Sequence, residues 1–212
     1  MIEMLYVILL MMIFITRTSA DLCENGKDDH CMALDCPQNS FNQEINWNTA
    51  STIHQFNAKD IYGVDIPLKK YNGSVLIIVN VASQCGLTDS NYKKLVEFYE
   101  KYRNKGLKIL AFPSNQFWNQ EPGTCDEILN FVKRYNVKFD MFGKIDINGK
   151  NAHPLWKWLT TQKDNATVDI TWNFTKFIID RDGKFVERFD PSFITGSDLI
   201  LMEKILNEIF LE

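Results

Sequence analysis

Four side chains of this chain could form a redox site, although they lie far apart in the sequence. They are Cys85, Gln116, Trp172 and Asn173. Each lies beside a strand-like apolar run, and an α/β sheet gathers its functional groups where its strands end. A thiol surrounded by the N–H groups of two amides and an indole could act as a nucleophile whose charge those donors stabilise. The pattern therefore favours thiol-based redox chemistry.

Cys85 is predicted to lie in the loop between a buried strand and an amphipathic helix. The unpaired N–H groups at the start of that helix would favour the thiolate. Gly86 would let the backbone pass close to the sulfur. The alternative is a small buried hydrophobic residue, which is what most lone cysteines are. The polar neighbours Ser83, Gln84 and Thr88 favour an accessible thiol instead.

The three donors are weak indications when each is taken alone. A Trp is more often a core residue, an Asn a turn or cap residue, and a Gln a surface residue. Together they meet a specific need, because a thiolate that breaks an O–O bond must leave the departing oxygen with a proton. Amide and indole N–H groups can orient a peroxide and stabilise that oxygen without adding charge.

Three segments around these residues resemble the motifs of the glutathione peroxidase family. They are 80–86, 112–117 with its continuation 120–123, and 172–177, and the resemblance extends over roughly residues 51–210. It implies that Cys85 is the peroxidatic residue and that Gln116, Trp172 and Asn173 complete the family's tetrad. It also implies an antioxidant peroxidase that responds to oxidative stress. Its substrates would be hydrogen peroxide and organic or phospholipid hydroperoxides, reduced through a Cys85 sulfenic acid.

The same resemblance implies glutathione or thioredoxin as the reducing co-substrate, with no prosthetic group and no metal. Leu87 stands where the glutathione-using phospholipid type often has Lys. The thioredoxin-using type has a resolving Cys in its second helix; the matching position here is Val132, and Cys125 precedes it by about two turns. We therefore expect Cys125 to be the candidate resolving residue, with a thioredoxin-type partner. The alternative is that Cys125 is bonded to the N-terminal extension or is free.

Two other departures concern substrate and assembly. Trp118 stands where the family usually has Gly or Leu, and it would place a bulky group beside the site. The segment 162–170 is short, as in the monomeric phospholipid-hydroperoxide type, whose open site accepts large lipid peroxides. The resemblance thus implies a monomer. A selenocysteine written as Cys at position 85 would form a selenenic rather than a sulfenic intermediate.

Periodicity predicts the elements that must position these residues. The predicted strands are 53–58, 75–81, 107–112, a short one with a turn at 144–149, and a hairpin of 174–179 with 184–189. The predicted helices are 89–103, 124–135, 154–161 and 197–210. The order βαβα followed by ββα gives a parallel pair extended by an antiparallel hairpin, with helices on both faces. We therefore expect an α/β, thioredoxin-like fold with a mixed central sheet.

The first fifty residues differ in composition from the rest. Residues 1–20 contain an apolar run at 5–15, too short to span a bilayer comfortably, followed by the small residues of a cleavage site. We expect a signal peptide, a secreted protein and no stable membrane anchor. The alternative is a retained signal anchor, since the leader carries Glu3 and no Lys or Arg before its apolar run. Residues 21–50 read as a polar extension, and 51–212 as the peroxidase-like domain.

Three of the five cysteines, Cys23, Cys31 and Cys36, lie in that extension. In an oxidising compartment we expect them to pair, which leaves one thiol for Cys125, for another chain, or free. Zinc binding with the help of His30 is the alternative, but the spacing matches no usual zinc pattern. A net charge of −4 gives no electrostatic case for binding nucleic acid.

Glycosylation sequons begin at Asn72, Asn165 and Asn173. The first two fall in predicted surface loops and could carry glycans, whereas a glycan on Asn173 would block the site.

Two other functions remain open. A thiol–disulfide exchanger is disfavoured because Cys85 has no second Cys three residues later. A non-enzymatic secreted binding protein on an inactivated peroxidase scaffold is disfavoured by the complete set of four site residues.

Overall fold

The computed structural model describes residues 36, 46–162, 167–191 and 196–211. The chain divides into two units, 1–33 and 34–212, and all described residues belong to the second. The expectations for the signal peptide, for most of the extension with Cys23 and Cys31, and for Asn165 lie outside the described residues. No helix within the described ranges is long and apolar enough to cross a bilayer.

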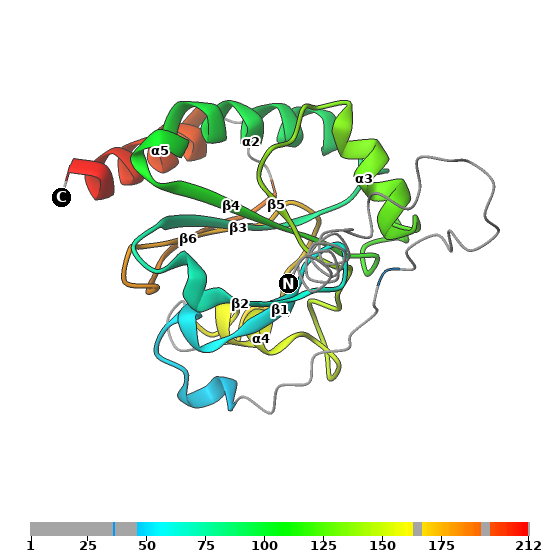
Figure 1. The fold of residues 1–212 in the computed structure, drawn as a ribbon, viewed down its shortest axis with the longest axis horizontal. Helices are drawn as coiled ribbons and strands as arrows, with labels where there is room; N and C mark the ends of the chain where they lie inside the picture. The colour runs from blue at the N-terminus through cyan, green and yellow to red at the C-terminus, as the bar shows by residue number, and fades with distance from the viewer. Residues whose placement is uncertain (1–35, 37–45, 163–166, 192–195, 212) are drawn as a thin grey trace, which may run out of the picture. The chain divides into compact units, whose positions relative to one another are not determined.

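A five-stranded mixed sheet forms the centre of the second unit, in the order β5-β4-β3-β6-β7 (Figure 1). Its strands are β3 (Val75–Val81), β4 (Leu107–Pro113), β5 (Asp140–Met141), β6 (Lys176–Ile179) and β7 (Phe185–Phe189). β3, β4 and β5 run parallel, whereas β6 and β7 pair antiparallel beside β3. A separate two-stranded sheet pairs β1 (Asn57–Lys59) with β2 (Asp65–Pro67). The predicted parallel pair with its antiparallel hairpin is confirmed.

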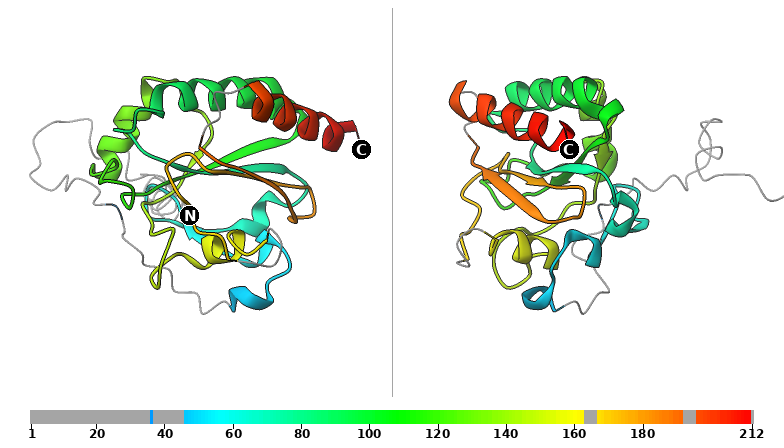
Figure 2. Two further views of the ribbon diagram at one scale, coloured as in Figure 1. Left: turned by 180° about the vertical axis from the view of Figure 1, so that it is seen from behind. Right: turned by 90° about the vertical axis from the view of Figure 1, so that its left-hand side faces the viewer.

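Helices cover both faces of the sheet. They are α2 (Thr88–Tyr102), α3 (Cys125–Lys133), α4 (Pro154–Leu159) and α5 (Gly196–Leu211). Alternate side chains of the fully buried β3 point to opposite faces. Val75, Ile77 and Val79 pack with α2, α3 and α5, whereas Leu76 and Ile78 pack with α4. Figures 1 and 2 show α2 and α5 on one side of the sheet and α4 on the other.

One predicted strand, 144–149, is wrong, and another, 53–58, is correct only at its last two residues, which belong to β1. The first half of 53–58 is a 3-10 helix (Ile53–Gln55) because Gln55 Oε1 accepts hydrogen bonds from the N–H groups of Ser51 (2.7 Å) and Thr52 (3.2 Å). The segment 144–149 is not a strand, since β4 ends at Pro113 and offers no further partners. Ile145 N–H binds the Pro113 carbonyl (3.0 Å), and the chain then turns away from the sheet.

Helix α3 begins as its sequence predicts. Thr124 Oγ1 accepts a hydrogen bond from the Glu127 N–H (3.3 Å), and Glu127 Oε2 accepts one from the Thr124 N–H (2.7 Å). The first residue of α3, Cys125, is buried and forms a disulfide with Cys36 across 89 residues of sequence. Of the alternatives for the extension, a bond from one of its cysteines to Cys125 is therefore the one observed.

Candidate active site

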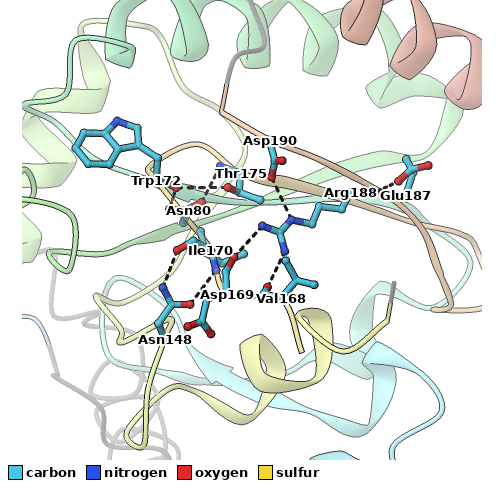
Figure 3. A network of polar contacts seen from close by, with 10 residues as sticks. All are labelled: Asn80, Asn148, Val168, Asp169, Ile170, Trp172, Thr175, Glu187, Arg188 and Asp190. Carbon is cyan, nitrogen blue, oxygen red and sulfur yellow. Dashed lines mark hydrogen bonds and ion pairs between the residues drawn. The ribbon is translucent and has the colours of Figure 1, made fainter. Parts of the chain in front are cut away.

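The first and third motif segments are joined by Asn80, near the end of β3 (Figure 3). Its Oδ1 accepts a hydrogen bond from the Thr175 N–H (2.8 Å), and its Nδ2 donates to the Trp172 carbonyl (3.1 Å). Its own carbonyl accepts from the Phe174 N–H (2.7 Å). The side chain is fully buried, so these bonds satisfy polar groups that water cannot reach. Asn80 therefore holds the Trp172 turn against the strand that leads to Cys85.

Cys85 lies in the tight loop before α2, with 8% of its surface exposed, and is a free thiol. Its Sγ accepts a hydrogen bond from the Leu87 N–H (3.4 Å). Thr88 Oγ1 accepts from the Cys85 N–H (3.1 Å) and donates to the Ala82 carbonyl (2.7 Å). These contacts hold the loop so that the start of the helix faces the sulfur, as the sequence predicts.

The side chains of the other three predicted site residues contact other parts of the protein. Gln116 is exposed, and its amide binds the backbone of residues 147–148 at 2.7–3.0 Å. The buried Asn173 donates from Nδ2 to Gln120 Oε1 (2.8 Å). Trp172 packs its indole against Phe117 and, edge to face, against Trp118 (ring centroids 5.1 Å apart). Within the described residues none of the three donates to the Cys85 sulfur, so direct donation there stays a prediction.

Backbone strain marks the turn that directly follows Trp172 and Asn173. Phe174 has a φ of 68°, a left-handed conformation that bulky residues rarely adopt. It is held there by the bond to Asn80 and by an edge-to-face contact with Tyr92 (6.0 Å between ring centroids). Strain of this kind persists where the surroundings require it, and it occurs mainly at functional sites. The turn leaves Trp172 half-buried and Asn173 fully buried.

A buried carboxyl group, that of Glu121, is hydrogen-bonded to the loop that carries Cys85. Glu121 is fully buried, and its Oε1 accepts a hydrogen bond from Ser83 Oγ (2.7 Å). Burial raises the pKa of Glu121 to about 7, although the Ser83 hydrogen bond and the positive charge of Lys144 oppose that rise. Gln84 N–H donates to the Gln120 carbonyl next to it (2.9 Å). The first and second motif segments are thus joined at the two residues directly before Cys85.

The irregular chain that leads into Trp172 is also held by side chains. Arg188 of β7 donates to the carbonyls of Val168 (2.7 Å) and Asp169 (3.0 Å) and pairs with Asp190 (3.2 Å; Figure 3). Sequence reasoning missed Arg188, Asn80 and Glu121 as supporting residues. Asn80 and Glu121 lay inside the recognised motifs, which was a usable signal; Arg188 carried no such signal. Across the described residues no group of three or more His, Cys, Asp or Glu side chains could hold a metal ion.

The contacts so far describe a free thiol at a helix start, supported by polar residues from two other strand ends. Residues 53–160 match the family model for glutathione peroxidase. The probable phospholipid hydroperoxide glutathione peroxidase of Mesembryanthemum crystallinum is 54% identical over 66% of this chain and 84% of that protein. The phospholipid hydroperoxide glutathione peroxidase of Callithrix jacchus is 53% identical over 68% of this chain and 75% of that protein.

Two solved structures are similar to this chain in both fold and sequence. The apo crystal structure of Trgpx has a TM-score of 0.60 and 32% identity, covering 77% of this chain and 98% of its own. T. cruzi GPX1 has a TM-score of 0.60 and 34% identity over 76% and 97% of the two chains. The fold is thioredoxin-like, and the protein is a peroxidase. The chain belongs to the glutathione peroxidase family and is an oxidoreductase that reduces hydroperoxides.

The disulfide to Cys36 bears on the expected role of Cys125 as a resolving residue. Bonded to Cys36, it has no thiol with which to attack a sulfenic acid at Cys85. Its role as a resolving residue therefore stays a prediction, and it applies only to a chain in which that disulfide has been reduced. Of the sequons, Asn72 is exposed, whereas Asn173 is fully buried with its Nδ2 bonded.

Proposed function

We propose that this protein reduces hydrogen peroxide and phospholipid hydroperoxides through a Cys85 sulfenic acid. The thiolate attacks one peroxide oxygen, the S–O bond forms as the O–O bond breaks, and the departing oxygen takes a proton to leave as water or an alcohol. A reducing thiol then displaces water from sulfur and forms a mixed disulfide with Cys85. A second thiol releases Cys85 and leaves as the oxidised disulfide.

The observation that carries this proposal is the state of the three cysteines in the described residues. Cys85 is the free thiol, whereas Cys36 and Cys125 are bonded to each other. A sulfenic acid is reduced by a thiol and not by a disulfide. With the Cys36–Cys125 bond in place, we propose that the reductant is an external thiol, glutathione or a thioredoxin-type protein, acting directly on Cys85.

Steady-state turnover of the oxidised, full-length chain tests both parts. Hydrogen peroxide and a phospholipid hydroperoxide are each supplied with glutathione or with thioredoxin and its reductase. We expect turnover of both peroxides with at least one external thiol while the Cys36–Cys125 disulfide stays intact. Absence of turnover with every pair would reject the proposed activity. Turnover only after that disulfide has been reduced would instead favour Cys125 as the resolving thiol.

The phospholipid substrate is suggested by the names of the relatives and by an unusual surface residue. Trp118 is 81% exposed and has a φ of 53°, so its ring is held outward at the edge of the Trp172 indole. An exposed Trp suits the boundary between water and acyl chains, because one end of its ring is polar and the rest apolar. We propose that Trp118 contacts the acyl chain of a lipid hydroperoxide.

Replacing Trp118 by Gly, which tolerates the left-handed backbone, tests this contact. We expect the ratio of kcat/KM for phospholipid hydroperoxide to kcat/KM for hydrogen peroxide to fall about fivefold, since losing one partial apolar contact costs about 1 kcal/mol. Tyr62→Ala, at an aromatic residue 62% exposed on the turn between β1 and β2, is the matched control and should keep the wild-type ratio. A ratio of the two kcat/KM values in Trp118→Gly equal to that of wild type would show that Trp118 does not contribute to lipid recognition.

We also propose that the protein is secreted after loss of residues 1–20 and is a monomer. Secretion is supported by the leader composition and by the disulfide, which suits an oxidising compartment. The short segment 162–170 supports the monomer. Recovery of a chain beginning at Asp21 from the culture medium of expressing cells would support secretion, and a stable tetramer in light scattering would contradict the monomer.

A further inference from the structure

The side chain of Asn148 makes the backbone hydrogen bonds that a neighbouring strand would otherwise make to the segment before Trp172. Asn148 lies in the loop between β5 and α4. Its Nδ2 donates to the Ile170 carbonyl (2.7 Å), and its Oδ1 accepts from the Ile170 N–H (3.0 Å; Figure 3). Ile170 is buried, two residues before Trp172, in a stretch without regular secondary structure. Asn148 therefore satisfies both backbone polar groups of Ile170, as a paired strand would.

The backbone of the same residue holds Gln116. The N–H groups of Ile147 (2.7 Å) and Asn148 (2.9 Å) both donate to Gln116 Oε1. The Asn148 carbonyl accepts from Gln116 Nε2 (3.0 Å). Because two N–H groups require an oxygen at that place, the Gln116 amide has a single orientation. An amide nitrogen carries two hydrogens, so the second one remains for a substrate oxygen.

We propose that Asn148 is a positioning residue that sets the Gln116 amide and the Trp172 segment relative to each other. The inference rests on the proposed function and on the prediction from the sequence that both residues donate to the peroxide. The backbone and side chain of one residue move together, so Asn148 couples two donors that are 56 residues apart in sequence (172 − 116). Misplacing a group by about 1 Å can slow a reaction by roughly 100-fold.

Asn148→Asp is the sharpest test, because it keeps the shape and replaces the Nδ2 donor by an oxygen facing the Ile170 carbonyl. While the new carboxyl is charged, the two oxygens repel; once protonated, it can donate again. We expect kcat/KM for hydrogen peroxide to fall roughly 10- to 100-fold at pH 8 relative to wild type. The ratio of kcat/KM in the variant to kcat/KM in wild type should rise towards one as the pH falls. The rate constant for the thiol with the oxidised enzyme, measured separately, should change less, whereas a general folding defect would lower both.

Two other variants complete the experiment. Asn151→Asp adds the same charge to an exposed residue of the same loop and should match wild type at every pH. Asn148→Ala removes both Ile170 bonds without adding charge, and should lose peroxide reactivity with no pH dependence in the ratio. Thermal melting of each variant shows whether it folds. A folded Asn148→Ala with wild-type peroxide reactivity, or a pH-independent ratio for Asn148→Asp, would overturn the positioning role.

A readout independent of activity separates this inference from the proposed function. The contribution of Trp172 to the tryptophan fluorescence of the protein is the emission that is lost when Trp172 is replaced by Phe. We expect that contribution to change in Asn148→Ala and to stay the same in Asn151→Asp. If the wild-type chain reduces no hydroperoxide, the proposed function fails, while the fluorescence still decides whether Asn148 positions Trp172. An unchanged Trp172 signal in a folded Asn148→Ala rejects the inference whatever the activity.

Discussion

Replacing Cys85 by Ser is expected to remove peroxide turnover, by at least about a thousandfold, because a serine alkoxide is scarcely available at neutral pH where a cysteine thiolate is. The fold should persist, since Cys85 makes no disulfide and a hydroxyl can still accept the Leu87 N–H. The measurement is the rate of hydrogen peroxide consumption with saturating thiol, with the melting temperature as the check on folding.

A matched control comes from the first turn of α2, directly after the Cys85 loop. Ser90→Ala removes a hydroxyl that donates to the Leu87 carbonyl (3.0 Å). It should keep most of the turnover, which would show that the start of α2 tolerates a small change. Substantial peroxide consumption by a folded Cys85→Ser would place the nucleophile elsewhere in the chain.

One equivalent of hydrogen peroxide, followed by one equivalent of glutathione, is expected to yield a single glutathione adduct on Cys85, since no second glutathione remains to release it. The sulfenic acid has no free thiol partner among the described cysteines, because Cys36 and Cys125 are bonded. Peptide mass spectrometry without prior reduction should therefore find the Cys36–Cys125 peptide pair intact and one adduct on the Cys85 peptide. The adduct should form in nearly every molecule, so the effect is close to all or none.

The Cys85→Ser chain is the control for this experiment and should take up no glutathione after peroxide. A Cys85–Cys125 linked peptide in the wild-type chain would contradict the external-thiol proposal and restore Cys125 as the resolving residue. The same linked peptide appearing only after mild reduction would mean that the Cys36 bond determines which thiol resolves Cys85.

Local patterns in the sequence predicted the elements around the site well. The uninterrupted apolar run at 75–79 indicated a strand buried on both faces, which β3 is. The Thr124 and Glu127 pair indicated the start of α3, because a capping box needs only residues three apart. The loop that carries Cys85 was predictable for the same reason: strand, turn and helix follow one another directly along the chain. The failure at 144–149 came from a partner strand that ends too early, which no local pattern shows.

Local sequence patterns thus established the thiol, its position at the start of a helix, and the motifs that identify the family. The pairing of Cys36 with Cys125 follows from the folded structure, as do the partners of the Gln116 amide and the contacts of Asn148 and Arg188. Each of these depends on atoms that are distant in sequence and meet only after the sheet has formed. A side-chain hydrogen bond to a backbone group leaves no periodicity in the sequence, because its partner is chosen by packing and not by spacing.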